Sequence, residues 1–213
     1  MDAYICELCS KKEKDYLSIK LFRILNWKLN NILISLDVRN AKSKIGSNSM
    51  NFQRNDLEAF GFEGFVKISH LKTNGCDIVP KQMGVYIVVN ENPQKFNYLK
   101  KSIGGYFKDK DPTVSILELK NNWVDNAYVV YIGKAGGVTS NATLFKRINQ
   151  YIQFGKGKKI GHRGGRYIWQ LKDSDNLLFA WKPLIDEDPR FIELSLINEF
   201  TKRYNKMPFA NLI

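Results

Sequence analysis

Two short motifs constrain the fold of this chain more than any other feature of its sequence. Gly84-Val85-Tyr86 opens an apolar run that continues to Asn90, and Tyr131-Ile132-Gly133 closes a run that begins at Ala127. The β-branched content of both runs is typical of buried strands. We expect the two strands to pair as a hairpin with a long connection and to direct both tyrosines into one cleft.

Further elements are expected after these strands. Apolar spacings of three and four residues predict a helix over 143–154, and a run that ends near Pro183 predicts a strand over 176–184. Acidic residues before 190–204 are suited to the start of a helix there. The predicted fold class is therefore α+β, with a small three-stranded antiparallel sheet flanked by helices.

The expected domain organisation has two parts. Residues 1–78 form a helical N-terminal extension, with an amphipathic helix over 12–37, and this extension is expected to serve dimerisation or DNA recognition. Residues 79–213 form the main domain, interrupted by an irregular insert at about 91–125 that contains Pro and Gly.

Composition indicates a soluble globular protein. Of 213 residues, 44% are hydrophobic and 25% are charged, and no apolar run is long enough to span a bilayer. The N-terminus lacks the pattern of a signal peptide, so we expect a cytoplasmic protein. Three cysteines argue against a disulfide framework. Cys6 and Cys9 have the spacing of half a zinc site, but no second pair completes it, and we favour free thiols.

The positive charge is concentrated in one part of the chain. The net charge is +12, and residues 126–172 contain nine Lys and Arg without a single acidic residue. A block of one sign favours a polyanionic partner through release of counterions. The alternative, a solvated basic face without a partner, is less favoured because aromatic residues and glycines are interleaved with these charges.

In their order along the chain, the motifs resemble those of the GIY-YIG nuclease superfamily. Gly84-Val85-Tyr86 and Tyr131-Ile132-Gly133-Lys134 correspond to the two motifs that name the family. An arginine is usual on the next helix, with Tyr or His four residues later, and Arg147 and Tyr151 stand there. The resemblance covers roughly residues 79–213.

The end of the chain extends the resemblance. Glu193-Leu194-Ser195-Leu196-Ile197 resembles the family's pattern around its metal-binding glutamate, and Pro208-Phe209-Ala210-Asn211 resembles its terminal Pro-x-x-Asn. Two spacings depart from the commonest pattern. The stretches between Tyr86 and Tyr131 and between Glu193 and Asn211 are both longer, and the second resembles certain restriction endonucleases of the family.

The resemblance implies catalytic roles for five residues. Glu193 is expected to hold Mg²⁺, or Mn²⁺ in its place, as the single carboxylate, because Mg²⁺ keeps much of its hydration. Arg147 would stabilise the charge of the transition state with its forked donors. Tyr86 is expected as the general base, Tyr131 to orient water or phosphate, and Lys134 to lie near the scissile phosphate. The two cations are expected to favour a phenolate.

Other residues are expected to bind DNA or to support the site. Tyr151 shares a helix face with Arg147 and either contacts phosphate or packs. Asn211 is expected to tie the C-terminal turn to the site. The adjacent Gly164 and Gly165 would let backbone amides approach phosphate. The basic side chains expected on the DNA backbone are Lys156, Lys158, Lys159, His162, Arg163 and Arg166.

The function expected from the resemblance is a Mg²⁺-dependent DNA endonuclease of the type II restriction kind. Such an enzyme hydrolyses phosphodiester bonds of double-stranded DNA by direct attack of water, and it works as a homodimer because each active site cuts one strand. Two alternatives stay open. One is a structure-specific repair or mobile-element nuclease, and the other is a nucleic-acid-binding module without catalytic activity.

Overall fold

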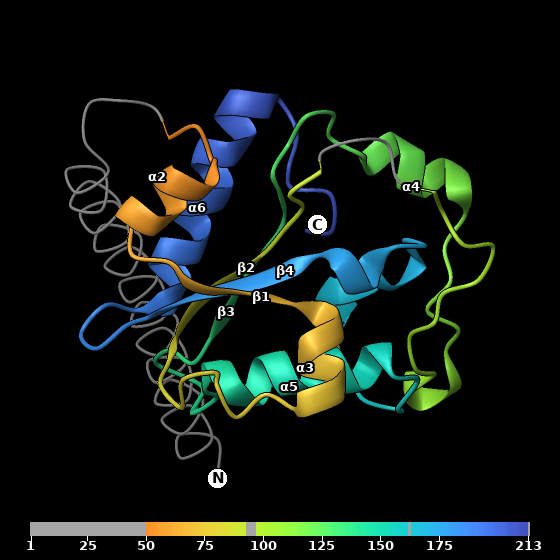
Figure 1. Cartoon of the computed structure of the whole chain (residues 1–213), viewed down its shortest axis with the longest axis horizontal. Helices are drawn as coiled ribbons and strands as arrows, with labels where there is room; N and C mark the ends of the chain where they lie inside the picture. The colour runs from red at the N-terminus through yellow and green to blue at the C-terminus, as the bar shows by residue number, and fades with distance from the viewer. Residues whose placement is uncertain (1–49, 93–96, 162, 213) are drawn as a thin grey trace, which may run out of the picture. The chain divides into compact units, whose positions relative to one another are not determined.

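A four-stranded antiparallel sheet forms the centre of the computed structural model (Figure 1). Its strand order is β1-β4-β2-β3. The strands are β1 (Glu63–Lys67), β2 (Gly84–Val89), β3 (Val129–Ala135) and β4 (Leu178–Pro183). The α+β class and the three strands expected after residue 79 are confirmed. The predicted number of strands is wrong, because β1 pairs with β4 and adds a fourth strand.

The structure describes residues 50–92, 97–161 and 163–212, and all of these belong to one compact unit. Residues 50–78 therefore belong to the same unit as the main domain, and the domain boundary lies before residue 50. They belong to it because β1 pairs with β4 in the sheet, and because Ile68 and Leu71 lie in the same buried core as the motif strands. The predicted helix over 12–37 lies outside the described residues.

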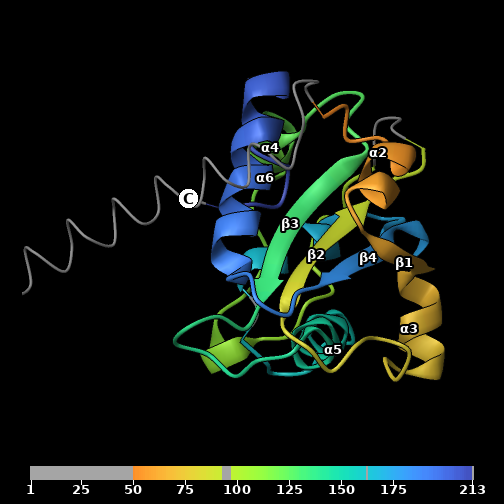
Figure 2. The ribbon, with the colours of Figure 1, turned by 90° about the vertical axis from the view of Figure 1, so that its left-hand side faces the viewer.

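Helices cover both faces of the sheet (Figures 1 and 2). On one side lie α2 (Arg54–Ala59) and α6 (Pro189–Tyr204), and on the other lie α3 (Ile68–Asn74) and α5 (Leu144–Gly155). The expected helices over 143–154 and 190–204 are confirmed within one residue at each end. The two short helices α2 and α3 were not expected.

Local sequence explains where the two long helices begin. The side chain of Thr143 accepts a hydrogen bond from the backbone N–H of Lys146 at 3.2 Å and caps α5. The side chain of Asp188 caps α6 in the same way, and Pro189 follows at a position where its missing N–H costs nothing. Both caps matter for the candidate site because it draws on the first turn of α5 and the second turn of α6.

The insert is more regular than expected. It contains α4 (Ile116–Asn122) and a short 3₁₀ helix over Phe107–Asp109. The buried amide of Gln170 fastens this segment to the body of the protein. Its Oε1 accepts from the backbone N–H of Val114 at 3.0 Å, and its Nε2 donates to the carbonyls of Leu99 and Val114. A buried amide with its hydrogen bonds satisfied holds one conformation of the insert.

Within the described ranges, we find no helix with both the length and the apolar character that crossing a bilayer requires.

Candidate active site

One pocket of about 340 Å³ collects all five residues that the sequence analysis expected to be catalytic. Tyr86 comes from β2, Tyr131 and Lys134 from β3, Arg147 from α5 and Glu193 from α6. Gly136, Ser140 and Ala142 complete its lining. Residues more than a hundred positions apart in the chain thus share one pocket.

The register of the two motif strands places the tyrosines on the same face. Tyr86 lies opposite Gly133, and Val88 lies opposite Tyr131. Because side chains alternate along a strand with a period of two, Tyr86 and Tyr131 both point toward α5. Their ring centroids are 5.9 Å apart.

The glycine of each motif is required by a close approach. A Cβ on Gly133 would lie 2.7 Å from Cζ of Tyr86, and a Cβ on Gly84 would lie 2.2 Å from the carbonyl oxygen of Lys182. Gly133 leaves room for the Tyr86 phenol across β3, and Gly84 lets β4 pair closely with β2. The motif glycines therefore shape the pocket without entering any chemistry.

Glu193 supplies the carboxylate of the pocket from the second turn of α6. Burial raises the pKa of Glu193 to about 7, against the opposing effects of Lys134, Arg147 and Arg190. Within the described residues no group of three or more acidic, His or Cys side chains is placed to hold a metal ion. This donor set fits Mg²⁺, which needs one or two carboxylates and keeps its waters.

Two cationic side chains line the same pocket, and each keeps hydrogen-bond donors that are free for a ligand. Lys134 Nζ donates to the carbonyl of Gly136 at 3.3 Å, and Arg147 Nη1 donates to Oε1 of Gln150 at 3.4 Å. Neither cation forms an ion pair with a described residue. Two cations and one acid give the pocket a positive balance, which is suited to a phosphate group.

Both phenols of the pocket are protonated in the metal-free protein. Burial raises the pKa of Tyr86, although the nearby Arg147 guanidinium and Tyr131 hydroxyl oppose it. Burial also raises the pKa of Tyr131 well above its usual value. Arg147 lowers the pKa of Tyr86, in the expected direction, but loss of hydration outweighs this charge, so the phenolate is not favoured in this state. The expected effect of Lys134 stays a prediction.

The Tyr86 hydroxyl lies near Tyr131 and Arg147 but makes no well-formed hydrogen bond with any described residue of the pocket. Tyr86 is fully buried, and its hydroxyl has no partner in hydrogen-bonding geometry among the described residues. Leaving such a hydroxyl unpaired costs about 1–3 kcal/mol, so this atom is poised to accept a ligand or water.

Asn211 supports the second motif from outside the pocket. Its Oδ1 accepts from the backbone N–H of Ile132 at 2.9 Å, and its Nδ2 donates to the carbonyl of Ile132 at 2.8 Å. The backbone N–H of Ala210 donates to the carbonyl of Val130 next to it. The C-terminal turn thus covers the open edge of β3 and fixes the strand that bears Tyr131.

No protein family, curated protein or solved structure gives a significant match to this chain. The resemblance to GIY-YIG nucleases thus depends on the motif residues alone, and we treat the function as a proposal.

The structure does not bring the expected DNA contact of Tyr151 to the surface. Tyr151 is 0% exposed, and its ring packs 5.7 Å from that of Tyr131 and 5.4 Å from that of Trp169. Its hydroxyl donates to the carbonyl of Gly165 at 3.4 Å. The expected DNA contact is wrong because α5 presents this position to the sheet, and the packing alternative holds.

The paired glycines have a similar structural reason. A Cβ on Gly165 would lie 2.3 Å from Cζ of Tyr151, and one on Gly164 would lie 2.7 Å from the hydroxyl of Tyr131. The short 3₁₀ helix over Arg163–Gly165 thus packs against the two phenols. The tyrosine rings explain why no side chain fits at either position, and the expected approach of these backbone amides to phosphate stays a prediction.

The described basic side chains that were expected on DNA do not line the pocket. Lys156 caps the end of α5 nine positions after Arg147, which is about 14 Å along a helix. Lys156, Lys158 and Lys159 are exposed beyond that far end, and Arg166 is partly buried against Glu118 at 3.5 Å. His162 and the side chain of Arg163 lie outside the described part of the chain.

Sequence analysis missed the loop that closes the pocket between β3 and α5. Gly136 and Gly137 have φ of 84° and 122°, and a Cβ on Gly137 would lie 3.0 Å from Oδ1 of Asp188. The loop after the second motif therefore touches the start of α6 beside Lys134. Gly136 and Gly137, which follow the second motif after Ala135, are the sequence signal that could have predicted such a turn.

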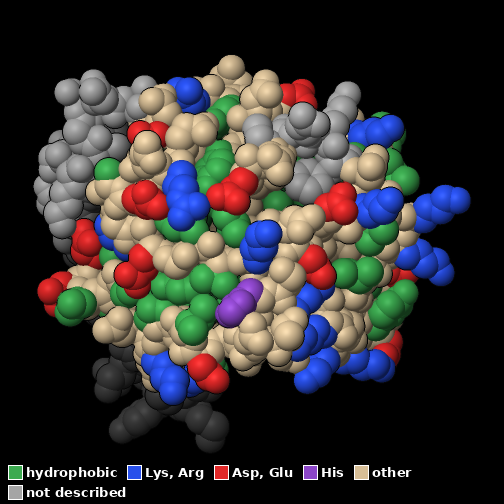
Figure 3. Space-filling view, in the orientation of Figure 1, with side chains coloured by type: hydrophobic (Ala, Val, Ile, Leu, Met, Phe, Trp, Pro, Cys, Tyr) green, Lys and Arg blue, Asp and Glu red, His purple; other side chains and the backbone are tan. Residues whose placement is uncertain are grey.

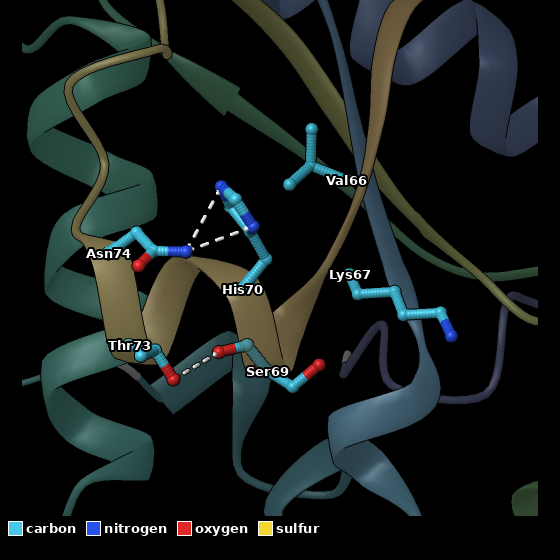
Figure 4. Close-up of a pocket in the computed structure, with 6 residues that line it drawn as sticks. All are labelled: Val66, Lys67, Ser69, His70, Thr73 and Asn74. Atoms are coloured by element: carbon cyan, nitrogen blue, oxygen red, sulfur yellow. Dashed lines mark hydrogen bonds between the residues drawn. The ribbon is translucent and has the colours of Figure 1, made fainter.

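A second hollow, of about 490 Å³, lies against β1 and α3 (Figure 4). It contains His70, whose ring faces the side-chain amide of Asn74 with Nδ1 at 3.0 Å. Its other lining residues are Val66, Lys67, Ser69 and Thr73. Without a carboxylate, this hollow has no counterpart to Glu193, and His70 takes no part in the candidate active site.

Proposed function

We propose that this protein is a Mg²⁺-dependent DNA endonuclease that resembles the GIY-YIG superfamily. The observation that carries the proposal is the meeting of two buried phenols, two unpaired cations and a single half-buried carboxylate in one pocket. The reaction would be hydrolysis of a phosphodiester bond, with double-stranded DNA as substrate in the manner of a type II restriction enzyme.

The pocket provides each group that this hydrolysis needs. Mg²⁺ would be held by Glu193 and would supply Lewis-acid activation of the phosphate and stabilisation of the leaving oxygen. Arg147 forks across two phosphate oxygens, and Lys134 neutralises charge beside them. The oxygen of water attacks phosphorus, the bond to O3′ breaks, and the products are a 5′-phosphate and a 3′-hydroxyl.

The two phenols bind and orient the attacking water. The unpaired Tyr86 hydroxyl holds this water, and Tyr131 orients it against the phosphate. Burial keeps the Tyr86 pKa high, and a cation held by Glu193 would lower it. Tyr86 would then take the proton of the attacking water. Activity would then rise with pH as the phenol loses its proton.

The position of Glu193 favours catalysis over binding alone. A carboxylate beside two phosphate-binding cations repels a phosphate group unless a cation stands between them. A module that only binds nucleic acid gains nothing from such a residue. The structure-specific repair or mobile-element nuclease uses the same chemistry, and only the pattern of products separates it from a restriction enzyme.

The test uses two variants of the same helix. Wild-type protein is expected to cut plasmid DNA with Mg²⁺ and to lose this activity with EDTA. Glu193→Gln should abolish cleavage while DNA binding survives. Glu199→Gln is the matched control, because Glu199 pairs with Lys202 at 2.8 Å and does not line the pocket. A Glu193→Gln protein that cuts as fast as wild type would refute the assignment.

The homodimer is part of the proposal, because one active site cuts one strand. Sedimentation of the protein with and without a DNA duplex tests it, and a monomer in both conditions would contradict it. Digestion of a long DNA of mixed sequence gives discrete bands for a restriction enzyme and none for a structure-specific one.

A further inference from the structure

A basic and aromatic surface lies at the end of α5 that is remote from the pocket. We call it the insert surface, formed by residues 99–111 and 156–161. It exposes two aspartates, Asp109 and Asp111, against seven exposed lysines: Lys100, Lys101, Lys108, Lys110, Lys156, Lys158 and Lys159. Figure 3 shows basic and hydrophobic side chains side by side at the right-hand edge of the molecule, where Figure 1 places the insert.

The two segments form one surface because they are packed together. The backbone N–H of Gly105 donates to the carbonyl of Phe154, and a Cβ on Gly105 would lie 1.9 Å from the carbonyl oxygen of Lys158. Lys159 pairs with Asp109 at 2.9 Å. Contacts of this kind hold the lysines of 156–161 beside the insert.

Two adjacent aromatic rings stand on this surface. Tyr106 is 41% exposed and Phe107 is 42% exposed. Asp111 next to Tyr106 raises the pKa of its phenol, so the ring stays neutral. Lys108 and Asp109 follow with φ of 52° and 55°, a left-handed conformation that costs free energy for non-glycine residues. A strained turn thus presents the two rings instead of burying them.

The charge of the insert surface selects its partner. Seven lysines favour a polyanion, and a symmetric contact with a second copy would oppose the same charges. Residues 1–44 contain nine Lys and Arg against five Asp and Glu, so their net charge is also positive and does not complement the insert surface. Exposed rings add a second preference, because bases offer their faces for stacking only when they are unpaired.

We propose that the insert surface binds unpaired nucleotides of a DNA strand, with bases stacked on Tyr106 and Phe107 and phosphates on the lysines. This inference rests on the proposed function, and it names the substrate class. The surface begins about 14 Å from Arg147 along α5, which is about four nucleotides of stacked strand. The substrate then combines a cleavable bond in the pocket with a single-stranded segment at that distance.

Binding in EDTA to the full chain carrying Glu193→Gln tests the proposal without cleavage. The probes are a blunt duplex and the same duplex with a single-stranded tail that contains 2-aminopurine, whose fluorescence falls on stacking. Replacing both rings, Tyr106→Leu with Phe107→Leu, is expected to weaken binding of the tailed duplex about tenfold or more and to abolish the quenching. Binding of the blunt duplex should stay within about twofold, since its bases are paired.

Two controls separate stacking from damage to the fold. Leu117→Ala removes an exposed aliphatic side chain from α4 and should leave binding of both probes unchanged. Tyr106→Phe with Phe107→Tyr keeps both rings and should keep both affinity and quenching. Equal losses on both probes, or no loss on the tailed duplex, would overturn the proposal. Because no cleavage is measured, this result is independent of the plasmid test of Glu193.

Discussion

The phenol of Tyr86 crosses β3 directly above Gly133, so closely that one added methyl group would lie 2.7 Å from its Cζ. This contact explains why the second motif ends in glycine. A side chain there would push the Tyr86 hydroxyl away from Tyr131 and Arg147. The glycine therefore determines the position of a group on another strand.

Gly133→Ala should displace the Tyr86 ring and lower the free energy of unfolding by about 1–3 kcal/mol, because the core is overpacked. Cleavage should fall with it, since the hydroxyl leaves the pocket. Urea denaturation and a plasmid assay measure the two effects. In a Tyr86→Leu background the cost of Gly133→Ala should shrink, and an unchanged cost would show that the two residues are not coupled.

Glu193 should make the metal-free protein less stable at alkaline pH. Its pKa rises from 4.5 to about 7 on folding, so between these values the folded protein binds the extra proton and stability falls as pH rises. Glu193→Gln cannot lose a proton. It should be more stable than wild type by about 1–3 kcal/mol at pH 8, after allowance for partial exposure, and nearly equal at pH 4.

Urea denaturation of both proteins in EDTA, at several pH values, measures this difference. Glu199→Gln should follow wild type across the whole range. A gain from Glu193→Gln that is the same at acid and alkaline pH would contradict the raised pKa.

Asn211→Leu should weaken the second motif strand without entering the pocket. It removes both side-chain hydrogen bonds to Ile132 and leaves that backbone uncompensated, at a cost of about 2–4 kcal/mol for two lost bonds. The midpoint of thermal unfolding and the rate of DNA cleavage should both fall. Asn205→Gly is the control in the same segment, because Asn205 ends α6 at φ of 53°, where glycine is preferred. Equal destabilisation by both changes would argue against the role of Asn211.

Gln170→Leu should release the insert from the body of the protein. The change leaves three partly buried backbone groups without their side-chain partner, two on Val114 and one on Leu99, and should cost about 3 kcal/mol. Limited proteolysis should then cut within 99–115 before the rest of the domain. Gln82→Leu, at an exposed position, should leave the digestion pattern unchanged.

Much of the fold followed from the sequence, and its errors have physical causes. The motif strands and the two long helices were predicted because their apolar periods are unbroken. β1 was missed as part of the sheet because Gly64 and Phe65, both at positive φ, interrupt its alternation. Tyr151 was assigned to DNA because a helix pattern gives the relative angle of two residues but not which of them faces the sheet.

The sequence by itself indicated the pocket residues, because Tyr86, Tyr131, Arg147 and Glu193 stand in motifs that resemble those of GIY-YIG nucleases. It also determined the helix starts, where the caps Thr143 and Asp188 act over three residues or fewer. Only the tertiary structure decided that Tyr151 packs in the core, and that a fourth strand joins the sheet. The physical reason is range: caps and periodicity act over a few residues, whereas burial and proximity depend on contacts between distant parts of the chain.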